Sequence, residues 1–237
     1  SSCFGDCPIC CLPLSLEPEK CTMMVCCSKI LCNGCVYGCR IANFNNMQER
    51  RERIAPSCPF CRTLTPKTKE EQDKQMKKRL EANDPVALRS QASEQYNKRE
   101  RDCSGAFEYW TKAAGLGDAV AHYKLSLMYH HGEGVEKDTR KEIHHAEEAA
   151  IGGHPGTRHH PGREEWNKGN TERAVRHWII AATLGYDLSI TSLIDAFKGG
   201  FVSKEELAST LRAHRVAVDA TKSPQREAAE EYARNRM

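Results

Sequence analysis

The sequence lacks any hydrophobic run long enough to cross a membrane. None of its apolar stretches approaches the roughly 18 to 20 residues that span a bilayer. Its first positions also lack the basic and then apolar layout of a secretory signal. We therefore expect no membrane segment and, by default, an intracellular protein, cytoplasmic or nuclear. The chain begins with Ser1 rather than methionine, so its natural start can lie upstream.

The sequence has no excess of charge of either sign and few aromatic residues. Its net charge is +3, from 35 basic and 32 acidic residues that are interspersed, as in "KTKEEQDKQMKKRLE". Aromatic residues make up 7% of the chain. A protein dedicated to nucleic acid usually presents a basic face with interleaved aromatics. We expect no nucleic-acid partner, and a zinc module that reads nucleic acid is a disfavoured alternative.

The second part of the chain has almost no cysteine, whereas the first part is rich in it. Of thirteen cysteines, twelve lie between Cys3 and Cys61, and only Cys103 lies beyond. In a chain without a secretory signal, a reducing compartment keeps thiols free to act as metal ligands. Metal ligation is therefore favoured over a disulfide framework.

The spacing of these cysteines predicts two zinc sites. Three C-x-x-C pairs, a spacing that directs two sulfurs at one metal, are accompanied by an adjacent doublet, and eight thiolates make two tetrahedral zinc sites. The eight are Cys7, Cys10, Cys26, Cys27, Cys32, Cys35, Cys58 and Cys61. Because adjacent ligands to one metal strain the backbone, Cys21 or Cys39 is an alternative to one member of the doublet.

The order "CPIC…CC…CNGC…CPFCR" resembles a RING-type zinc finger, in the variant where cysteine replaces the central histidine. The resemblance implies a small cross-brace fold in which the ligand pairs interleave. It assigns Cys7, Cys10, Cys32 and Cys35 to one zinc, and Cys26, Cys27, Cys58 and Cys61 to the other. A segment with few aromatics buries little apolar area, so metal binding is expected to supply most of its folding free energy, roughly 10 kcal/mol per site.

The same resemblance implies a ubiquitin ligase. RING modules of this kind bind a ubiquitin-conjugating enzyme through apolar residues of the two zinc loops, here Ile9 and Pro59. A basic residue after the last ligand, here Arg62, contacts ubiquitin, and Val36 or Tyr37 would complete the groove. Such a module catalyses transfer by positioning rather than by making bonds. The alternative is a non-enzymatic adaptor whose zinc finger is structural.

The remaining thiols predict no covalent catalysis. They are Cys3, Cys11, Cys21, Cys39 and Cys103. A nucleophilic cysteine needs a base and a depressed pKa, and nothing near Cys103 in "RERDCSGAF" supplies a base. These cysteines are interpreted as packing or surface thiols.

Helical patterns begin after Arg62. Thr68 and Glu71 match a capping box, which predicts a charged linker helix over residues 69–82. Asp84 followed by Pro85 predicts the start of the next helix.

The remaining chain repeats itself at the length of a helical hairpin. Gly117, Gly153 and Gly185 each follow a pair of alanines and lie 36 and 32 residues apart, and Trp110 and Trp178 are separated by 68 residues. Paired alanines let two helices approach closely, and each glycine suits a left-handed helix end.

The segment "AHYKLSLMYHHGEGVEKDTRKEIHHAEEAAIGG" resembles a Sel1-like repeat, a relative of the tetratricopeptide repeat. The matching positions are Ala121, Leu125, Tyr129, Gly132, Gly134, Val135, Asp138, Lys141, Ala149, Ala150 and Gly153. Ser126, Glu142 and His145 depart from the family pattern. The resemblance implies a protein substrate or scaffold bound on the concave face of the repeats.

The repeats are expected to be irregular. The first unit keeps only its second helix well. Pro155, Gly156, Pro161 and Gly162 fall where the first helix of the third unit belongs, and an interior proline costs a helix about 3 kcal/mol, so a shortened or broken helix is predicted. Ser203 and Glu206 form another capping box in a fourth unit.

The histidine doublets at 130–131, 144–145 and 159–160 suggest a second metal, but His145 occupies an aromatic position of the repeat and the others are expected in turns. "HGEGV" is interpreted as an inter-helix turn rather than a phosphate loop.

The predicted organisation is a RING-like zinc domain over residues 1–62 and a helical linker over 63–84. An all-α helical-hairpin solenoid over 85–222 follows, with units 85–117, 118–153, 154–186 and 187–222. A polar tail that frays is expected over 223–237.

Overall fold

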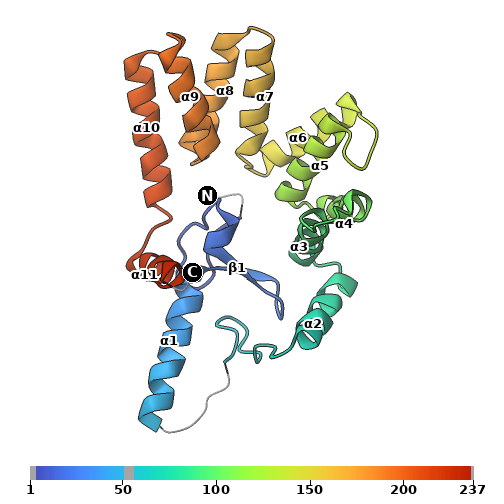
Figure 1. Cartoon of the computed structure of the whole chain (residues 1–237), viewed down its shortest axis with the longest axis vertical. Coiled ribbons are helices and arrows are strands. Elements are labelled where there is room, and N and C mark those ends of the chain that lie inside the picture. The colour runs from blue at the N-terminus through green and yellow to red at the C-terminus, as the bar shows by residue number, and fades with distance from the viewer. Residues whose placement is uncertain (1–3, 51–55, 236–237) are drawn as a thin grey trace.

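The structure, a computed structural model, describes residues 4–50 and 56–235. An N-terminal module contains the short 3-10 helix η1 (Pro18–Lys20), strands β1 (Cys21–Met24) and β2 (Lys29–Cys32), and helix α1 (Asn33–Arg50). A row of helices forms an arc that starts and ends beside this module (Figure 1). Within the described residues, no helix is both long and apolar enough to cross a bilayer.

The two strands form an antiparallel hairpin in which Cys21 pairs with Cys32 and Met24 with Lys29. The core of the module is small and consists half of cysteine. Its buried members are Cys7, Leu14, Leu31, Cys32, Cys35 and Val36. So little apolar area contributes only a limited hydrophobic stabilisation, as the sequence predicted.

The linker helix α2 (Lys69–Glu81) is capped as expected at its start, where the Thr68 side chain accepts the Glu71 N–H. The reciprocal half of the capping box differs, because the Glu71 carboxylate accepts the N–H of Lys67 rather than that of Thr68. At the start of the next helix, Asp84 accepts the N–H groups of Val86 and Ala87, with Pro85 at the first helical position. The predicted cap is confirmed.

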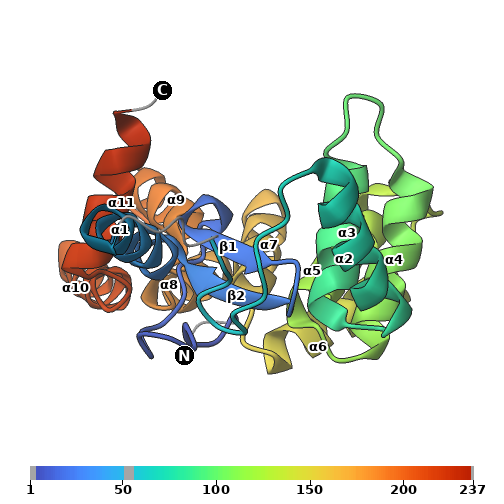
Figure 2. The same ribbon diagram turned by 90° about the horizontal axis from the view of Figure 1, so that it is seen from below.

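The repeats form helix pairs that pack in sequence order (Figure 2). The helices are α3 (Pro85–Tyr96), α4 (Cys103–Gly115), α5 (Ala119–His131), α6 (Thr139–Ile151), α7 (Gly156–Asn167), α8 (Thr171–Thr183), α9 (Asp187–Lys198) and α10 (Lys204–Asp219). Trp110 and Trp178 are 1% and 4% exposed, each at the centre of a separate alanine-rich core. The repeat of 68 residues therefore reflects equivalent packing.

The turn chemistry of the repeats is confirmed. Gly117, Gly153 and Gly185 have φ angles of 83°, 77° and 88°, which side chains other than glycine rarely adopt. Gly132 ends α5 in the left-handed conformation, so "HGEGV" is an inter-helix turn. The capping box of Ser203 and Glu206 at the start of α10 is present in both directions.

Helix α7 is continuous through Pro161, so the prediction of a broken helix is wrong. The glycines beside the proline explain why the helix persists. A Cβ at Gly156 would lie 2.7 Å from the Tyr123 ring, and a Cβ at Gly162 would lie 2.6 Å from the indole nitrogen of Trp178. Close contact with these aromatic rings stabilises α7 despite its unfavourable helix propensity.

The polar tail also differs from its prediction. Residues after Ser223 form helix α11 (Pro224–Arg234), which is capped by the Ser223 side chain. The helix returns to the N-terminal module and lies beside α1 (Figure 1). The tail is polar in sequence, but it is part of the folded structure.

Candidate metal centres

The first C-x-x-C pair lies in a tight knuckle closed by backbone hydrogen bonds. The N–H of Cys7 donates to Leu12 O at 2.9 Å, and the N–H of Cys11 donates to Cys7 O at 2.8 Å. Leu14 N–H donates to Gly5 O at 3.0 Å and joins the two arms of the knuckle. The backbone therefore fixes the directions in which the two cysteine side chains leave it.

The last C-x-x-C pair repeats this bonding. Cys58 N–H donates to Thr63 O at 2.8 Å, Arg62 N–H donates to Cys58 O at 2.9 Å, and Thr65 N–H donates to Pro56 O at 2.8 Å. Each of these bonds has its counterpart at the same offset in the first knuckle. The two segments, which share the pattern C-P-x-C, thus have the same backbone arrangement for two sulfurs.

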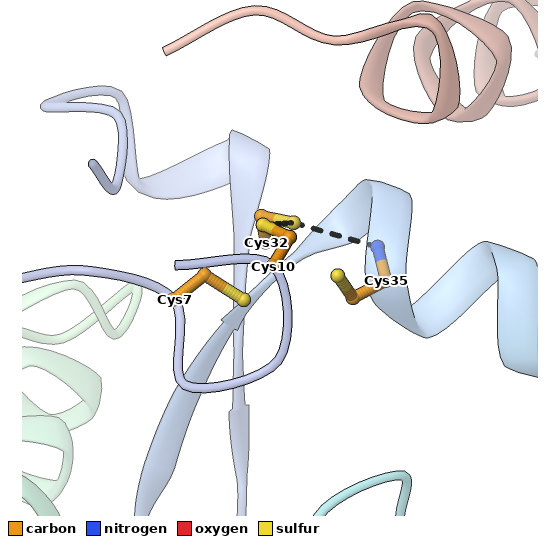
Figure 3. Close-up of side chains that lie close together, drawn as sticks. All are labelled: Cys7, Cys10, Cys32 and Cys35. Carbon is orange, nitrogen blue, oxygen red and sulfur yellow. Dashed lines mark hydrogen bonds between the residues drawn. The ribbon is translucent and has the colours of Figure 1, made fainter. Parts of the chain in front are cut away.

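The other cysteines of the predicted set come from the hairpin and the start of α1. Cys26 and Cys27 lie in the turn between β1 and β2, where Ser28 takes a left-handed φ of 55°. Cys32 ends β2, and Cys35 lies in the first turn of α1. The backbone N–H of Cys35 donates to the Cys32 sulfur at 3.4 Å (Figure 3).

The structure brings the eight predicted sulfurs together in two groups. One group is Cys7, Cys10, Cys32 and Cys35, and the other is Cys26, Cys27, Cys58 and Cys61; within each, the sulfurs lie within 4.8 Å of one another. Figure 3 shows the four side chains of the first group converging on a common centre. The groups interleave along the chain in the order that the resemblance implied.

The spacing of the sulfurs fits a tetrahedral zinc ion. Two sulfurs bound about 2.3 Å from such an ion lie about 3.8 Å apart. The Cys10 and Cys32 sulfurs are 3.8 Å apart, and those of Cys27 and Cys58 are 3.9 Å apart. The Cys26 and Cys61 sulfurs are closer, at 3.3 Å. Both groups therefore have the donor chemistry and the size for one zinc ion each.

Within each group, the pKa of one thiol is lowered while the pKa values of others are raised. Burial acts to raise the pKa of Cys10, but hydrogen bonds from the backbone at Leu12 and from Arg226 lower it to about 7. Burial and the neighbouring Cys32 sulfur raise the pKa of Cys35. Crowded thiolates repel one another, and a divalent cation removes that repulsion.

The second group likewise contains one thiol with a lowered pKa and others with raised pKa values. Against the effect of burial, hydrogen bonds from the side chain and backbone of Thr63 lower the pKa of Cys61 to about 6. Burial and hydrogen bonds with Cys61 and Cys58 raise the pKa of Cys26.

The alternative ligands lie outside both groups. Cys21 lies in β1, where burial raises its pKa to about 11, and its sulfur lies 3.9 Å from the Ser15 carbonyl oxygen. Cys39 lies in α1, half-buried, and Cys11 is exposed after the first knuckle. Cys103 begins α4, and Cys3 lies outside the described residues.

The residues predicted to contact a conjugating enzyme lie in the two knuckles and in α1. Ile9 is 39% exposed, and Arg62 is exposed directly after its knuckle. Val36 and Pro59 line the same cavity of about 350 Å³ between α1, β1 and the last knuckle, but Val36 is only 8% exposed. Tyr37 faces α11 instead. The residues predicted for this contact therefore differ in how much surface they expose.

Helix α11 covers Tyr37, whose ring centroid lies 5.0 Å from that of Tyr232. Two arginines that sequence reasoning missed also reach the cysteine groups. Arg79 of α2 donates to the Cys26 carbonyl oxygen, with its Nε at 3.1 Å. Arg226 of α11 donates to the Cys10 sulfur at 3.4 Å. No local pattern in the sequence distinguishes these two arginines from the many others.

The comparison with protein families concerns the helical half. A family model described as "Sel1 repeat" matches residues 97–118, 119–154 and 165–186. The second half of the chain therefore carries Sel1 repeats. The match omits all of α3 and most of α7, the two helices that sequence reasoning identified as least typical. No curated protein matches the chain.

One solved structure shows a similar fold, and a second has a weaker likeness. A Sel1 repeat protein from Oxalobacter formigenes is 22% identical with a TM-score of 0.52, and the alignment covers 75% of this chain and 73% of that chain. A protective antigen of uropathogenic Escherichia coli strains, displaying an SLR fold, is 24% identical with a TM-score of 0.47. That alignment covers 63% of this chain and 33% of the antigen, so the chain spans about a third of the antigen's length.

The Sel1 repeats enclose a cavity of about 890 Å³ between α5, α6 and α7. Its apolar lining includes Leu127, Ile143, Ala146, Ala150 and Ile151. Ile143 and Ile151 are 51% and 80% exposed. This is a surface with apolar side chains available to a protein partner.

The histidine doublets lie around this part of the Sel1 repeats. His145 takes the aromatic position, as predicted, and stacks on Tyr129 at 5.7 Å between ring centroids. The expectation that the others lie in turns is wrong. His130 and His131 are the last residues of α5, His144 lies in α6, and His159 and His160 lie in α7. Within the described residues, the groups able to hold a metal consist of cysteines.

Proposed function

We propose that the chain is a two-zinc RING-like protein that acts as a ubiquitin ligase, with the Sel1 repeats holding the protein that receives ubiquitin. The observation that carries the proposal is the interleaving of two sulfur groups built on twin knuckles. The pairs in each group come from segments far apart in the sequence. Zinc would therefore cross-brace a module whose own apolar core is too small to hold it.

The chemistry of zinc in this protein would be structural. Four thiolates fill the coordination of each ion and leave no open position for water or substrate. Catalysis would then consist of holding the thioester-linked ubiquitin of a conjugating enzyme in a reactive geometry. That role requires an exposed contact surface, not a nucleophile of this chain.

Two exposed residues beside the knuckles would supply that surface. Ile9 offers an apolar side chain from the first knuckle. Arg62 presents a guanidinium from the last knuckle, and its planar donors can bridge two proteins. Pro59, partly exposed in the last knuckle, adds apolar surface.

The Sel1 repeats would bind the substrate or a scaffold. The exposed isoleucines of α6 beside the large cavity give an apolar surface, and repeat arrays bind proteins on such faces. The N-terminal module would then recruit the conjugating enzyme, and the Sel1 repeats would select the substrate.

The test is an autoubiquitination assay with a panel of conjugating enzymes, performed after zinc content is measured. Ile9→Ala and Arg62→Asn should abolish transfer while leaving zinc bound. Asparagine suits position 62 because it tolerates the left-handed φ of 60° found there. Ile41→Ala is the matched control, because Ile41 has the same 39% exposure and lies in helix α1 of the same module, outside both C-x-x-C segments.

A second candidate function is that of a non-enzymatic adaptor. It is favoured by the burial of Val36 and by the packing of Tyr232 on Tyr37, which leave less apolar surface open. An adaptor would bind two zinc ions and a protein partner without stimulating any conjugating enzyme. Zinc binding without transfer across the whole panel would favour this function over the first.

A further inference from the structure

Arg226 is a buried cation at the first sulfur group. The residue is only 7% exposed. Its guanidinium donates to the carbonyl oxygens of Pro13 at 2.7 Å and Leu12 at 3.2 Å, and to the Cys10 sulfur at 3.4 Å. It also donates to Thr221 O, close to its own helix. Within the described part of the chain, no carboxylate pairs with it.

A buried charge without a counter-charge is costly, because several kcal/mol of hydration are lost on burial. Four thiolates around a divalent zinc ion leave a net charge of about −2. A zinc-loaded first group would therefore supply the negative charge that Arg226 lacks. Neutral thiols would not supply this charge, so the buried guanidinium is more stable when the metal is bound.

The rest of α11 fits closely against the module. A Cβ at Gly34 would lie 2.7 Å from the backbone nitrogen of Arg226, so only glycine allows this approach. A Cβ at Gly38 would lie 3.2 Å from the side-chain nitrogen of Gln225, and Lys20 forms an ion pair with Glu230 at 3.6 Å. The packing of α11 on the module therefore positions Arg226.

We propose that Arg226 is a positioning residue of the first zinc site and that zinc binding controls the docking of α11. The guanidinium donates a hydrogen bond to a zinc-bound thiolate and balances its charge. Loading of the first site then fixes the end of the Sel1 repeats to the N-terminal module. This inference rests on the zinc binding contained in the proposed function.

Arg79 provides an internal comparison. It also joins a helix to a sulfur group, but it donates to the backbone oxygen of Cys26 and, among the described residues, makes no hydrogen bond to a sulfur. Removal of Arg79 should weaken the attachment of α2 without changing the electronic character of a zinc thiolate. Arg79→Gln is therefore the matched control for Arg226→Gln.

The experiment uses the full chain loaded with zinc or with cobalt(II) as a spectroscopic probe. Arg226→Gln should lower zinc affinity at one of two sites by roughly 10- to 100-fold in competition with a chelator. It should also shift the thiolate-to-cobalt absorption band, because a hydrogen bond to sulfur stabilises the thiolate. Arg226→Lys should retain part of the zinc affinity and should shift the band less than Arg226→Gln does. Arg79→Gln should leave the band unchanged.

Hydrogen exchange of the unmodified chain is the second measurement, since it does not depend on any variant folding. The amides of α11 should be protected when zinc is bound and lose protection when zinc is removed. Equal protection in both states, or an unchanged affinity and spectrum in Arg226→Gln, would overturn the inference while zinc binding itself stands. A chain that binds no zinc would overturn both this inference and the proposed function.

Discussion

Cys11 and Arg62 occupy the same position in the two knuckles. Each follows the second cysteine of its pair and has a left-handed φ, of 55° and 60°. Each donates its backbone N–H to the carbonyl oxygen of the first cysteine, at 2.8 and 2.9 Å. For a residue other than glycine this conformation costs about 1 kcal/mol, so both knuckles contain a strained residue held by the surrounding bonds.

The position of Cys11 predicts that this cysteine is no ligand. Cys11→Gly should retain two zinc ions and stabilise the module by about 1 kcal/mol, because glycine adopts the left-handed conformation without strain. Native mass spectrometry gives the zinc count, and chelator-driven release gives the stability. Cys10→Ser is the comparison and should lose one ion. Loss of zinc from Cys11→Gly would show that the assignment of the first group is wrong.

Removal of zinc should unfold the N-terminal module and spare the repeats. The core of the module is half cysteine, whereas the buried members of the two repeat cores, which are centred on Trp110 and Trp178, include no cysteine. All three tryptophans of the chain lie in the repeats, so tryptophan emission reports on that half alone. A strong chelator should leave the emission maximum unchanged. A red shift of the emission would mean that the repeats depend on the metal.

The sequence predicted the elements that depend on neighbouring residues. The C-x-x-C spacing determines where two sulfurs point, and the interleaved grouping of the pairs was implied by the resemblance to a RING-type zinc finger. The caps at Asp84 and Ser203 are equally local, since each needs only a side-chain oxygen and the next few N–H groups. Even the adjacent Cys26 and Cys27 fit one group, because the hairpin turn directs both sulfurs to it.

The sequence could not predict features that depend on distant contacts. The docking of α11 depends on the close approach of Arg226 to Gly34, which nothing near either residue indicates. The burial of Val36 depends on how α1 packs in the module, and a pattern of ligands carries no information about that packing. Helix α7 persists because glycine leaves room for aromatic rings from other helices, while local propensity alone indicated a break.

The contact between Gly162 and Trp178 predicts a specific sensitivity of the third repeat. In Gly162→Ala the new methyl group would lie 2.6 Å from the indole nitrogen, and the buried ring has little room to move. We expect a loss of about 1 to 3 kcal/mol in the free energy of unfolding, as for other overpacked cores. Urea denaturation followed by tryptophan fluorescence measures the loss.

Gly115→Ala is the control, because Gly115 lies in α4 with open space around its Cβ position. That substitution should be neutral or stabilise the protein by up to about 1 kcal/mol through helix propensity. A similar response from both variants would mean that Trp178 adjusts freely to the added methyl group.

Acid should destabilise the repeats through His154. Its ring stacks on Tyr123 at 4.0 Å between ring centroids and is 9% exposed. Burial, with nearby Lys124 and Arg89, lowers the pKa of His154 to about 3. In the unfolded chain the pKa returns to about 6.5, so the unfolded state binds the proton first as the pH falls.

The stability contributed by neutral His154 is therefore complete above about pH 6.5 and is lost progressively as the pH falls toward 3. As the pH falls from about 7.5 to about 5.5, this histidine should lower the free energy of unfolding by about 1.4 kcal/mol. Urea denaturation at the two pH values measures the free energy of unfolding. For His154→Gln, this free energy should fall by about 1.4 kcal/mol less than it does for the unmodified protein. Thiolate protonation affects both proteins equally, so an identical fall in the variant would show that His154 does not titrate on unfolding.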